Sequence, residues 1–383
     1  MEEKRYMEVA SEMNLLALGE SAGVVYWKPA GLKLYENLKK FIRVHHEKRG
    51  YLEVKSPSIV VAKLFEQSGH SEKYASNMFF VNSGDEGNYA LRPMSCPNHI
   101  LIYQSEGRSY RQLPYPVFEF GDVYRNEPSG SLQVLFRQRQ FCQDDSHVFV
   151  SPEKLIDSIS NYLLMSKEVY KELGFEKIHY AISLRPEQRF GSDEDWDKAE
   201  NSLRDACNSH SIEFEELPGE GAFYGPKIEL KVQDKLGRFW QLGTLQLDYV
   251  LPQRFDLEYN DSNGERAKPI ILHHAVLGSL ERMIGILLES FGKNIPEFLQ
   301  PYPSVIVAVS EKSRDYSAVL QKEIPNSLLD DSDEPLGKKL AYWRSRGVPN
   351  IYVVGEKEAQ EFADSGVKKA VLNKGKERQL CEF

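Results

Sequence analysis

The sequence predicts an α+β fold on an antiparallel sheet, followed by a small C-terminal α/β domain. Short strand-like runs alternate with turns between about residues 78 and 150. Lys227–Val232 and Phe239–Val250 alternate apolar and polar side chains, as half-buried strands do. Helical patterns stand apart from these runs, which favours strands that pair with their sequence neighbours. A cluster of prolines over residues 296–303 then marks a domain boundary.

The chain has 383 residues, which is more than one compact core usually holds. We therefore expect an N-terminal lead-in over residues 1–30, a large domain over 31–298 and a small domain over 299–383.

The large domain is expected to begin with an amphipathic helix over residues 31–49, where apolar residues recur at helical spacing until Gly50. A strand over Tyr51–Lys55 follows. The clearest later strands are Val117–Tyr124 and Phe141–Val150.

The next segments alternate helix and strand: a helix over 152–172, a strand over Ile178–Leu184, a helix over 193–209 and another beginning near Ala275. In the small domain, the expected elements are a strand over Val305–Val309, helices over 312–323 and 337–346, and a strand over Ile351–Val354.

Composition describes an ordinary soluble protein, with 41% hydrophobic and 27% charged residues. No apolar run approaches 18 residues, so no membrane span is expected, and the start lacks a signal-peptide pattern. Four scattered cysteines favour a reducing compartment, which predicts a cytoplasmic protein. The net charge of −9 argues weakly against a nucleic-acid partner, but only the contacting patch must be basic.

A predicted hairpin carries groups that suit a nucleotide. Arg125 and Glu127 follow one strand, and Arg137 precedes the next, which begins at Phe141. Arginine forks bind phosphate oxygens, a glutamate can accept from the adenine amino group, and a phenylalanine can stack on the base. The alternative is a solvated hairpin rich in arginine and glutamate.

The helix expected near Ala275 places Gly278, Arg282 and Gly285 on one face. Glycines beside an arginine let the backbone approach a ligand closely and aim the guanidinium at it. A core helix with a salt-bridged arginine is the alternative.

Metal-capable residues lie far apart in the chain: Cys96, His147 and His273, with His99 and His274 nearby. One thiolate and two imidazoles make a three-ligand zinc site with an open fourth position. A buried cysteine and hydrogen-bonded histidines are the plainer interpretation.

Together these motifs resemble class II aminoacyl-tRNA synthetases, and threonyl-tRNA synthetases in particular. The helix before Gly50 with Pro57, the Arg125 segment and the Arg282 helix occur in the order of the three class motifs. The resemblance is close over about residues 15–300. The strings that carry it are Arg92–Pro97, Arg125–Leu132, Leu184–Glu187 with Gly191–Glu194, Gly219–Lys227 and Trp240–Asp248.

The resemblance implies one zinc ion per chain on Cys96, His147 and His273, which holds the amino group and hydroxyl of L-threonine. It also implies ATP with Mg²⁺ as the second substrate. A site built around a hydroxyl rejects valine strongly but discriminates poorly against serine, which lacks only one methyl group.

The resemblance further assigns roles to side chains of the large domain. Arg125, Arg282, Lys227 and Gln246 are expected to serve catalysis, the last two near the reacting carboxylate. The expected amino-acid contacts are Met94, Gln143, Asp145, Tyr224 and Gln246. The expected ATP contacts are Arg125, Glu127, Arg137, Phe141, Gln241, Thr244 and Arg282.

The implied partners are tRNA(Thr) and a second copy of the chain, bound through the helix over 31–49 and the strand ending at Pro57. Family members carry N-terminal editing residues that this sequence lacks, so no editing in cis is expected, which leaves room for a separate editing protein acting in trans. Gln133 and Val134 replace the usual residues of a loop that contacts tRNA.

The small domain departs further from the family pattern. It is expected to be a shortened anticodon-binding domain, and an acidic loop over 328–334 stands where a basic one is usual. Lys338, Lys339, Arg344 and Arg346 could still form an RNA patch, or a solvated basic face.

Two other functions fit the sequence. One is a related adenylate-forming enzyme that loads threonine on an acceptor other than tRNA. The other is a non-catalytic protein that binds tRNA or has a regulatory role. The retained arginines and metal-capable residues argue against the second.

Overall fold

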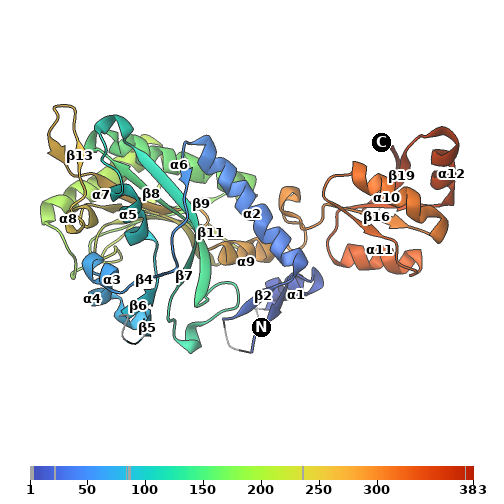
Figure 1. Cartoon of the computed structure of the whole chain (residues 1–383), viewed down its shortest axis with the longest axis horizontal. Helices are drawn as coiled ribbons and strands as arrows, with labels where there is room; N and C mark the ends of the chain where they lie inside the picture. Colours follow the sequence, from blue (N-terminus) through green and yellow to red (C-terminus); the bar gives the residue numbers. More distant parts are fainter. Residues whose placement is uncertain (1–3, 21–22, 83, 85–87, 235–236, 376) are drawn as a thin grey trace. The chain divides into compact units, whose positions relative to one another are not determined.

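The computed structural model describes residues 4–20, 23–82, 84, 88–234, 237–375 and 377–383 (Figure 1). It divides into two compact units. The sheet unit comprises Gly19–Val25 and Lys39–Ile286, and the terminal unit comprises Met1–Leu18, Tyr26–Leu38 and Leu287–Phe383. In the residues described, no helix combines the length and apolarity that a membrane span needs.

The sheet unit is built on eight strands in the order β10-β9-β11-β12-β15-β8-β7-β3, of which β7, β8, β9 and β11 are labelled in Figure 1. The inner pairs are antiparallel, and only the outer pairs β10–β9 and β3–β7 are parallel. The predicted α+β fold on an antiparallel sheet is therefore confirmed. The strands are β3 Leu52–Glu53, β7 Tyr115–Tyr124, β8 Gln140–Val150, β9 Ile178–Ser183, β10 Phe214–Leu217, β11 Lys227–Gln233, β12 Phe239–Asp248 and β15 Ile270–Ala275.

The two faces of the sheet pack against different helices. On one face, α6 (Leu155–Glu172) donates a hydrogen bond from Tyr170 to the carbonyl of Val276 at 2.8 Å. The C-terminal end of α2 (Pro29–Lys48) stacks His46 on Phe118 of β7, with 4.4 Å between ring centroids. Side chains alternate along a strand. Residues of β8 and β15 that are adjacent in sequence to those on this face therefore project to the opposite face of the sheet.

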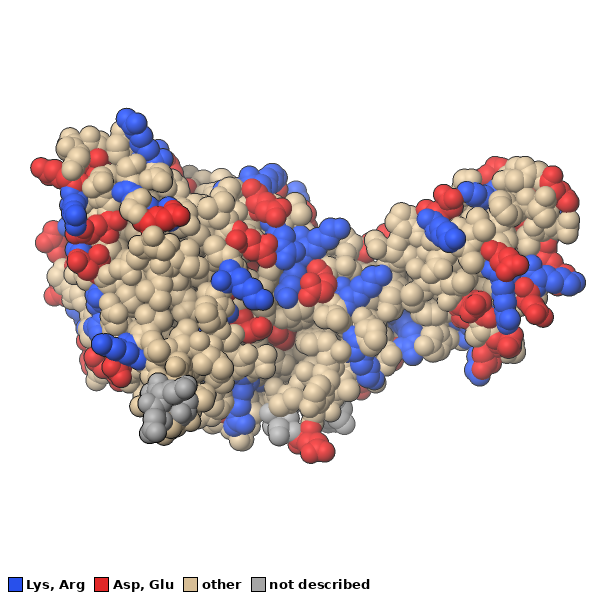
Figure 2. Space-filling view, viewed as in Figure 1, with Lys and Arg blue, Asp and Glu red and all other residues tan. Residues whose placement is uncertain are grey.

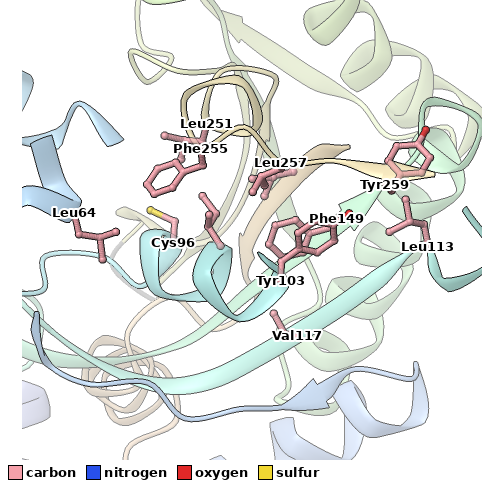
Figure 3. Packing of buried hydrophobic residues seen from close by; sticks show 12 residues of the cluster. Leu64, Cys96, Tyr103, Leu113, Val117, Phe149, Leu251, Phe255, Leu257 and Tyr259 are labelled. Carbon is pink, nitrogen blue, oxygen red and sulfur yellow. The ribbon is translucent and has the colours of Figure 1, made fainter. Parts of the chain in front are cut away.

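The opposite face is covered by α5 (Cys96–Gln104) over an apolar cluster. Tyr103 of α5 stacks on Phe149 of β8 at 4.2 Å between centroids, and Val117 of β7 lies beside them (Figure 3). Cys96, the first residue of α5, belongs to the same buried cluster. This packing fixes the start of α5 over the middle of the sheet.

Smaller elements complete the sheet unit. A three-stranded sheet in the order β4-β6-β5 joins the region between α2 and α5. Helix α7 is capped by Ser192, whose hydroxyl accepts from the backbone N–H of Asp195. The bounds are β4 Ile59–Val61, β5 Phe79–Asn82, β6 Asn88–Leu91, α3 Lys63–Ser68, α4 His70–Lys73, α7 Asp193–Ser209, α8 Leu251–Arg254, β13 Tyr259–Asn260, β14 Arg266–Ala267 and α9 Leu280–Phe291.

Three expectations for this unit were wrong. The helix expected near Ala275 begins at Leu280, because the preceding residues form β15, which is buried on both faces and shows no alternation. Gly278 therefore lies in a turn before α9 with φ 74° and does not share a helix face with Arg282. The strand expected over 51–55 shortens to β3.

The terminal unit carries the predicted α/β module. Its sheet has the order β17-β16-β18-β19-β20, parallel over the first three strands and antiparallel over the rest. Apolar clusters cover both faces. The bounds are α1 Lys4–Glu12, β1 Leu16–Leu18, β2 Val25–Trp27, β16 Ser304–Ala308, α10 Arg314–Glu323, β17 Ser327–Asp330, α11 Leu336–Ser345, β18 Asn350–Val354, α12 Glu356–Ser365, β19 Lys369–Lys374 and β20 Glu377–Glu382.

The basic patch considered on α11 is smaller than expected. Lys339 is 3% exposed and donates to the carbonyl of Ala308 at 2.8 Å, so it faces the core. Lys338 pairs with Glu334, and the guanidinium of Arg346 lies over the ring of Tyr342. On the face of this unit seen in Figure 2, acidic and basic side chains are interspersed.

Candidate active site

One row of polar side chains crosses the middle of the eight-stranded sheet. Lys227 of β11 is paired in register with Gln246 of β12, Gln246 with His273 of β15, and His273 with His147 of β8. Paired residues of neighbouring strands project to the same face. Four strands that lie between Gln140 and Ala275 in the sequence thus place one amine, one amide and two imidazoles side by side.

The start of α5 completes a metal-capable cluster at one end of this row. Ligand atoms of Cys96, His147 and His273 all lie within 4.8 Å of one another, and the three residues are buried. The apolar cluster around Cys96 holds its thiol in place (Figure 3). The structure therefore brings together the three residues assigned to zinc, and His274, on the opposite face, instead bonds to the hydroxyl of Tyr51 at 2.7 Å.

The two imidazoles are each engaged through one nitrogen. Nε2 of His273 lies 2.9 Å from a carboxylate oxygen of Asp248, and Nδ1 of His147 lies 2.7 Å from Nδ1 of His99. Within the described ranges of the chain, no hydrogen bond engages the other nitrogen of either ring. Nε2 of His147 and Nδ1 of His273 are thus the atoms available to a metal, and with a cysteine sulfur they form the donor set of an open zinc site.

Burial governs the protonation of this cluster in the absence of metal. It raises the pKa of the Cys96 thiol well above its ordinary value, with Asp145 and Asp248 adding to the effect, and it lowers the pKa of His147. Neutral imidazoles are the form that binds metal ions, whereas the thiol must release its proton on coordination. The donor set fits a divalent cation that displaces that proton.

Arginines gather at the other end of the cavity. Arg282 on α9 donates from Nε to the carbonyl of Phe136 at 3.0 Å and from Nη1 to the carbonyl of Gln241 at 3.2 Å. Burial lowers its pKa, and the nearby positive charges of Arg137 and Arg125 lower it further. Like charges held together in a half-enclosed space favour the binding of an anion.

The turn before α9 aims Arg282 at this end. Both carboxylate oxygens of Asp144 accept backbone N–H groups from Val276 and Leu277 at 2.8–3.1 Å. At Gly278 a Cβ atom would lie 2.5 Å from the carbonyl oxygen of Leu242, so the turn packs too closely for any side chain. The positive φ of this glycine supports the same requirement.

The hairpin formed by β7 and β8 supplies the remaining charged groups. The guanidinium of Arg125 lies 5.1 Å from the ring centroid of Phe141, and its Nε donates to the carbonyl of Pro93 at 3.3 Å. Arg137 lies 3.6 Å from Glu127 across the loop. These contacts hold two cations, a carboxylate and an aromatic face around one space.

All the residues assigned from the sequence line a single cavity of about 470 Å³. Its wall includes two further local contacts: Gln241 donates to Thr244 at 3.1 Å, and Gln246 donates to the carbonyl of Gly225 at 3.3 Å. The lining residues predicted from sequence are Met94, Cys96, Arg125, Glu127, Arg137, Phe141, Gln143, Asp145, His147, Tyr224, Lys227, Gln241, Thr244, Gln246, His273 and Arg282.

Sequence reasoning missed several residues of this region. Asp248 stands two positions after Gln246 on β12, so strict alternation alone places it on the same face. Phe136 lines the cavity and stacks on Trp240 at 4.4 Å between centroids, which no local pattern signals. His70 lies beside the cavity wall, with Nε2 3.1 Å from the sulfur of Met94 and its ring 6.2 Å from that of Tyr224.

Comparison with known protein families gives two matches along the chain. Residues 79–291 match the tRNA synthetase class II core domain of the glycine, histidine, proline, serine and threonine enzymes. Residues 304–376 match an anticodon-binding domain. The first match contains every residue assigned above to the cavity.

Individual relatives are threonine–tRNA ligases. Those of Marinobacter nauticus and Burkholderia ambifaria are 40% and 42% identical over 367 and 362 residues, or 94% and 93% of this chain. The chain spans 57% of the length of each of them. A crystal structure of the RNA-binding domain of threonyl-tRNA synthetase from Cryptosporidium parvum is 34% identical, with a TM-score of 0.92, and the match covers 98% of this chain and 95% of that one.

Proposed function

Since this chain belongs to the threonyl-tRNA synthetases of class II, we propose that it activates L-threonine with ATP and transfers it to tRNA(Thr). The observation that carries the proposal is a single cavity with a three-ligand metal cluster at one end and a group of arginines at the other. An amino acid and a nucleoside triphosphate would meet between these two ends, over Lys227 and Gln246.

At the metal end, Cys96, His147 and His273 would hold Zn²⁺, which supplies a Lewis acid with open positions for the amino and hydroxyl groups of threonine. Asp145, whose side chain is 15% exposed and whose Oδ1 lies 3.9 Å from Nδ1 of His147, would accept a hydrogen bond from the amino group. Tyr224 would enclose the side chain of threonine, which limits its size. Gln143 and Met94 would line the same pocket.

At the arginine end, Arg125, Arg137 and Arg282 would hold the triphosphate, and Glu127 with Phe141 would bind the adenine. Gln241 and Thr244 would lie near the ribose or phosphates. The class uses Mg²⁺ with ATP, which neutralises further phosphate charge. Positioning and neutralisation of charge account for most of the catalysis of such a reaction.

The chemical step is attack of a threonine carboxylate oxygen on the α-phosphorus of ATP. A carboxyl–phosphate bond forms, the bond to the bridging oxygen breaks, and pyrophosphate leaves. Lys227 and Gln246 lie in register on neighbouring strands, where they would orient the carboxylate between metal and phosphate. A ribose hydroxyl of the tRNA end then attacks the activated carbonyl carbon, and AMP leaves.

The protein partners are part of the same proposal. Val44 on α2 is 54% exposed and Leu52 on β3 is 51% exposed, and we propose that they lie in a two-fold interface with a second copy. Sedimentation at micromolar concentration should give a dimer, and Val44→Glu with Leu52→Glu should give a monomer. The four free thiols support a cytoplasmic location.

Charging of tRNA tests the proposed function. The protein is incubated with ATP, radiolabelled threonine and total tRNA, and acid-precipitable threonine is counted. Threonyl-tRNA should form with the parent protein and not with Arg282→Ala. Exchange of pyrophosphate without charging would favour another acceptor for threonine, and the absence of both reactions would favour a non-catalytic protein.

A further inference from the structure

We propose that Glu119 and His99 are positioning residues that set the tautomer of His147 and so direct its Nε2 lone pair at the metal. This inference rests on the proposed zinc site. It concerns how the chain prepares one ligand before any metal or substrate arrives.

The geometry is a buried line of three side chains. An oxygen of Glu119 lies 3.2 Å from Nε2 of His99, and Nδ1 of His99 lies 2.7 Å from Nδ1 of His147. All three are at most 2% exposed, so water does not compete for these contacts. The rings of His99 and His147 are nearly perpendicular, with 4.7 Å between their centroids.

With His99 neutral, only one arrangement of protons satisfies every contact in this line, whereas a doubly protonated His99 would donate to both neighbours and leave the proton of His147 on Nε2, where it blocks a metal. A carboxylate accepts hydrogen bonds only, so the proton between Glu119 and His99 must lie on Nε2 of His99. A neutral His99 then presents Nδ1 as an acceptor, and Nδ1 of His147 must carry the proton between the two rings. Nε2 of His147 is left with a lone pair, which is the form that binds a metal ion.

Glu119 is held strongly enough to impose this order. Arg92 donates from Nη1 to its Oε1 at 2.6 Å, and Ser56 donates from its hydroxyl to Oε1 at 2.7 Å and from its backbone N–H to Oε2 at 3.0 Å. Burial alone would raise the pKa of Glu119, but the bond from His99 and the charge of Arg92 lower it to about 2. The carboxylate therefore remains an acceptor at neutral pH.

The second imidazole ligand, His273, is also oriented by a carboxylate, but without an intervening histidine. Asp248 accepts directly from Nε2 of His273, which leaves Nδ1 of that ring for the metal. The other oxygen of Asp248 accepts the backbone N–H groups of Val250 and Leu251 at 2.7 and 2.9 Å. Each ligand ring is thus oriented by an anchored carboxylate, directly in one case and through His99 in the other.

Zinc affinity of the full chain tests the role of His99. The dissociation constant of Zn²⁺ is measured at pH 7.5 by competition with a chromophoric chelator. His99→Phe keeps a buried ring but removes the acceptor, and it should weaken zinc binding by about 10–100-fold. His99→Asn places an amide oxygen near the lost Nδ1, and it should restore binding to within about threefold of the parent protein.

A matched control separates this role from packing. His46 is also fully buried and makes two hydrogen bonds, but it lies on the opposite face of the sheet. His46→Phe should leave the zinc dissociation constant unchanged. If His99→Phe binds zinc as the parent does, or if His99→Asn is as weak as His99→Phe, the proposal is overturned.

A second measurement needs no variant and is independent of folding defects. Long-range ¹H–¹⁵N spectra of protein labelled in histidine, recorded before and after loading with zinc, should show in both states the proton of His147 on Nδ1 and that of His99 on Nε2. A proton on Nε2 of His147 contradicts the proposal. If the parent protein binds no zinc, the metal site of the proposed function fails as well, whereas normal zinc binding with the wrong tautomer overturns the positioning role alone.

Discussion

His147 and His273 stand directly opposite each other on the antiparallel strands β8 and β15, with 4.7 Å between their ring centroids. The register of two strands, separated by more than a hundred residues of chain, therefore creates the metal-capable pair. A shift of one residue in this register would turn one imidazole to the opposite face, where His274 now lies. The site thus depends on sheet pairing more than on any local motif.

The metal prediction follows from this pairing. The purified protein should hold about one zinc per chain, and Cys96→Ser or His273→Ala should remove most of it, because a two-ligand site binds weakly. His274→Ala is the matched control, since its side chain bonds Tyr51 on the opposite face. Metal analysis after dialysis checks the prediction, and full zinc retention in both ligand variants would refute the assignment.

Loss of a cavity arginine should affect activation much more than folding. Arg282→Ala and Arg125→Ala should each lower threonine-dependent pyrophosphate exchange by at least about 100-fold, because each removes a preorganised cation from a phosphate. Arg266, which is 75% exposed on its side chain and pairs with Glu258, provides a surface control. Losses of only a few-fold in both cavity variants would mean that the nucleotide binds elsewhere.

Substitution of Gly225 should disturb the amino-acid pocket. A Cβ atom at this position would lie 1.8 Å from the carbonyl oxygen of Leu247, so the segment that carries Tyr224 must move. Gly225→Ala should raise the KM for threonine and lower the melting temperature by several degrees. Gly107→Ala, where an added Cβ meets nothing within 4 Å, should change neither quantity.

Stability should fall in acid partly because of His46. Burial lowers the pKa of His46 to about 4, from an ordinary value of 6.5. Between these values the unfolded chain binds a proton that the folded chain does not, so this stability is complete above pH 6.5 and is lost as the pH falls toward 4. From pH 7 to pH 5 the loss from one such histidine is about 2 kcal/mol.

Urea unfolding at a series of pH values checks the His46 prediction. Between pH 7 and pH 5, the free energy of unfolding of His46→Gln should fall by about 2 kcal/mol less than that of the parent protein. This difference is expected whatever the effect of the substitution on absolute stability. His210, which is partly exposed, is a suitable control position. An unchanged slope in His46→Gln would show that His46 does not titrate in this range.

Much of the sheet was predictable because half-buried strands and amphipathic helices repeat with their own periods. The alternation of Lys227–Gln233 and the capped helix Asp193–Ser209 are examples. Strand β15 was missed because all six of its residues are buried, so its pattern carries no period. Helix α5 was missed for a related reason, since its buried residues include polar Asn98 and His99 and do not form one apolar face.

Residue chemistry alone singled out the hairpin arginines and the metal-capable residues, but the other cavity residues could be assigned from sequence only through their resemblance to a family. No local pattern states that Lys227, Gln246, His273 and His147 form one row, because strand register is a tertiary property. The hydrogen bonds that orient the metal-capable histidines could not be predicted from the sequence. His99 was considered only as an alternative ligand, and its bond to His147 emerges only when α5 packs over β8.

Pyrophosphate exchange with the zinc-loaded protein and threonine, serine or valine tests the central claim most directly. Serine retains the hydroxyl and lacks one methyl group, a difference of about 1–3 kcal/mol, so it should be activated about 10–200-fold less efficiently than threonine. Valine lacks the hydroxyl and should be activated about 10⁴-fold less efficiently or worse. Absence of threonine-dependent exchange, or activation of valine as efficient as that of serine, would contradict a cavity that recognises the threonine hydroxyl.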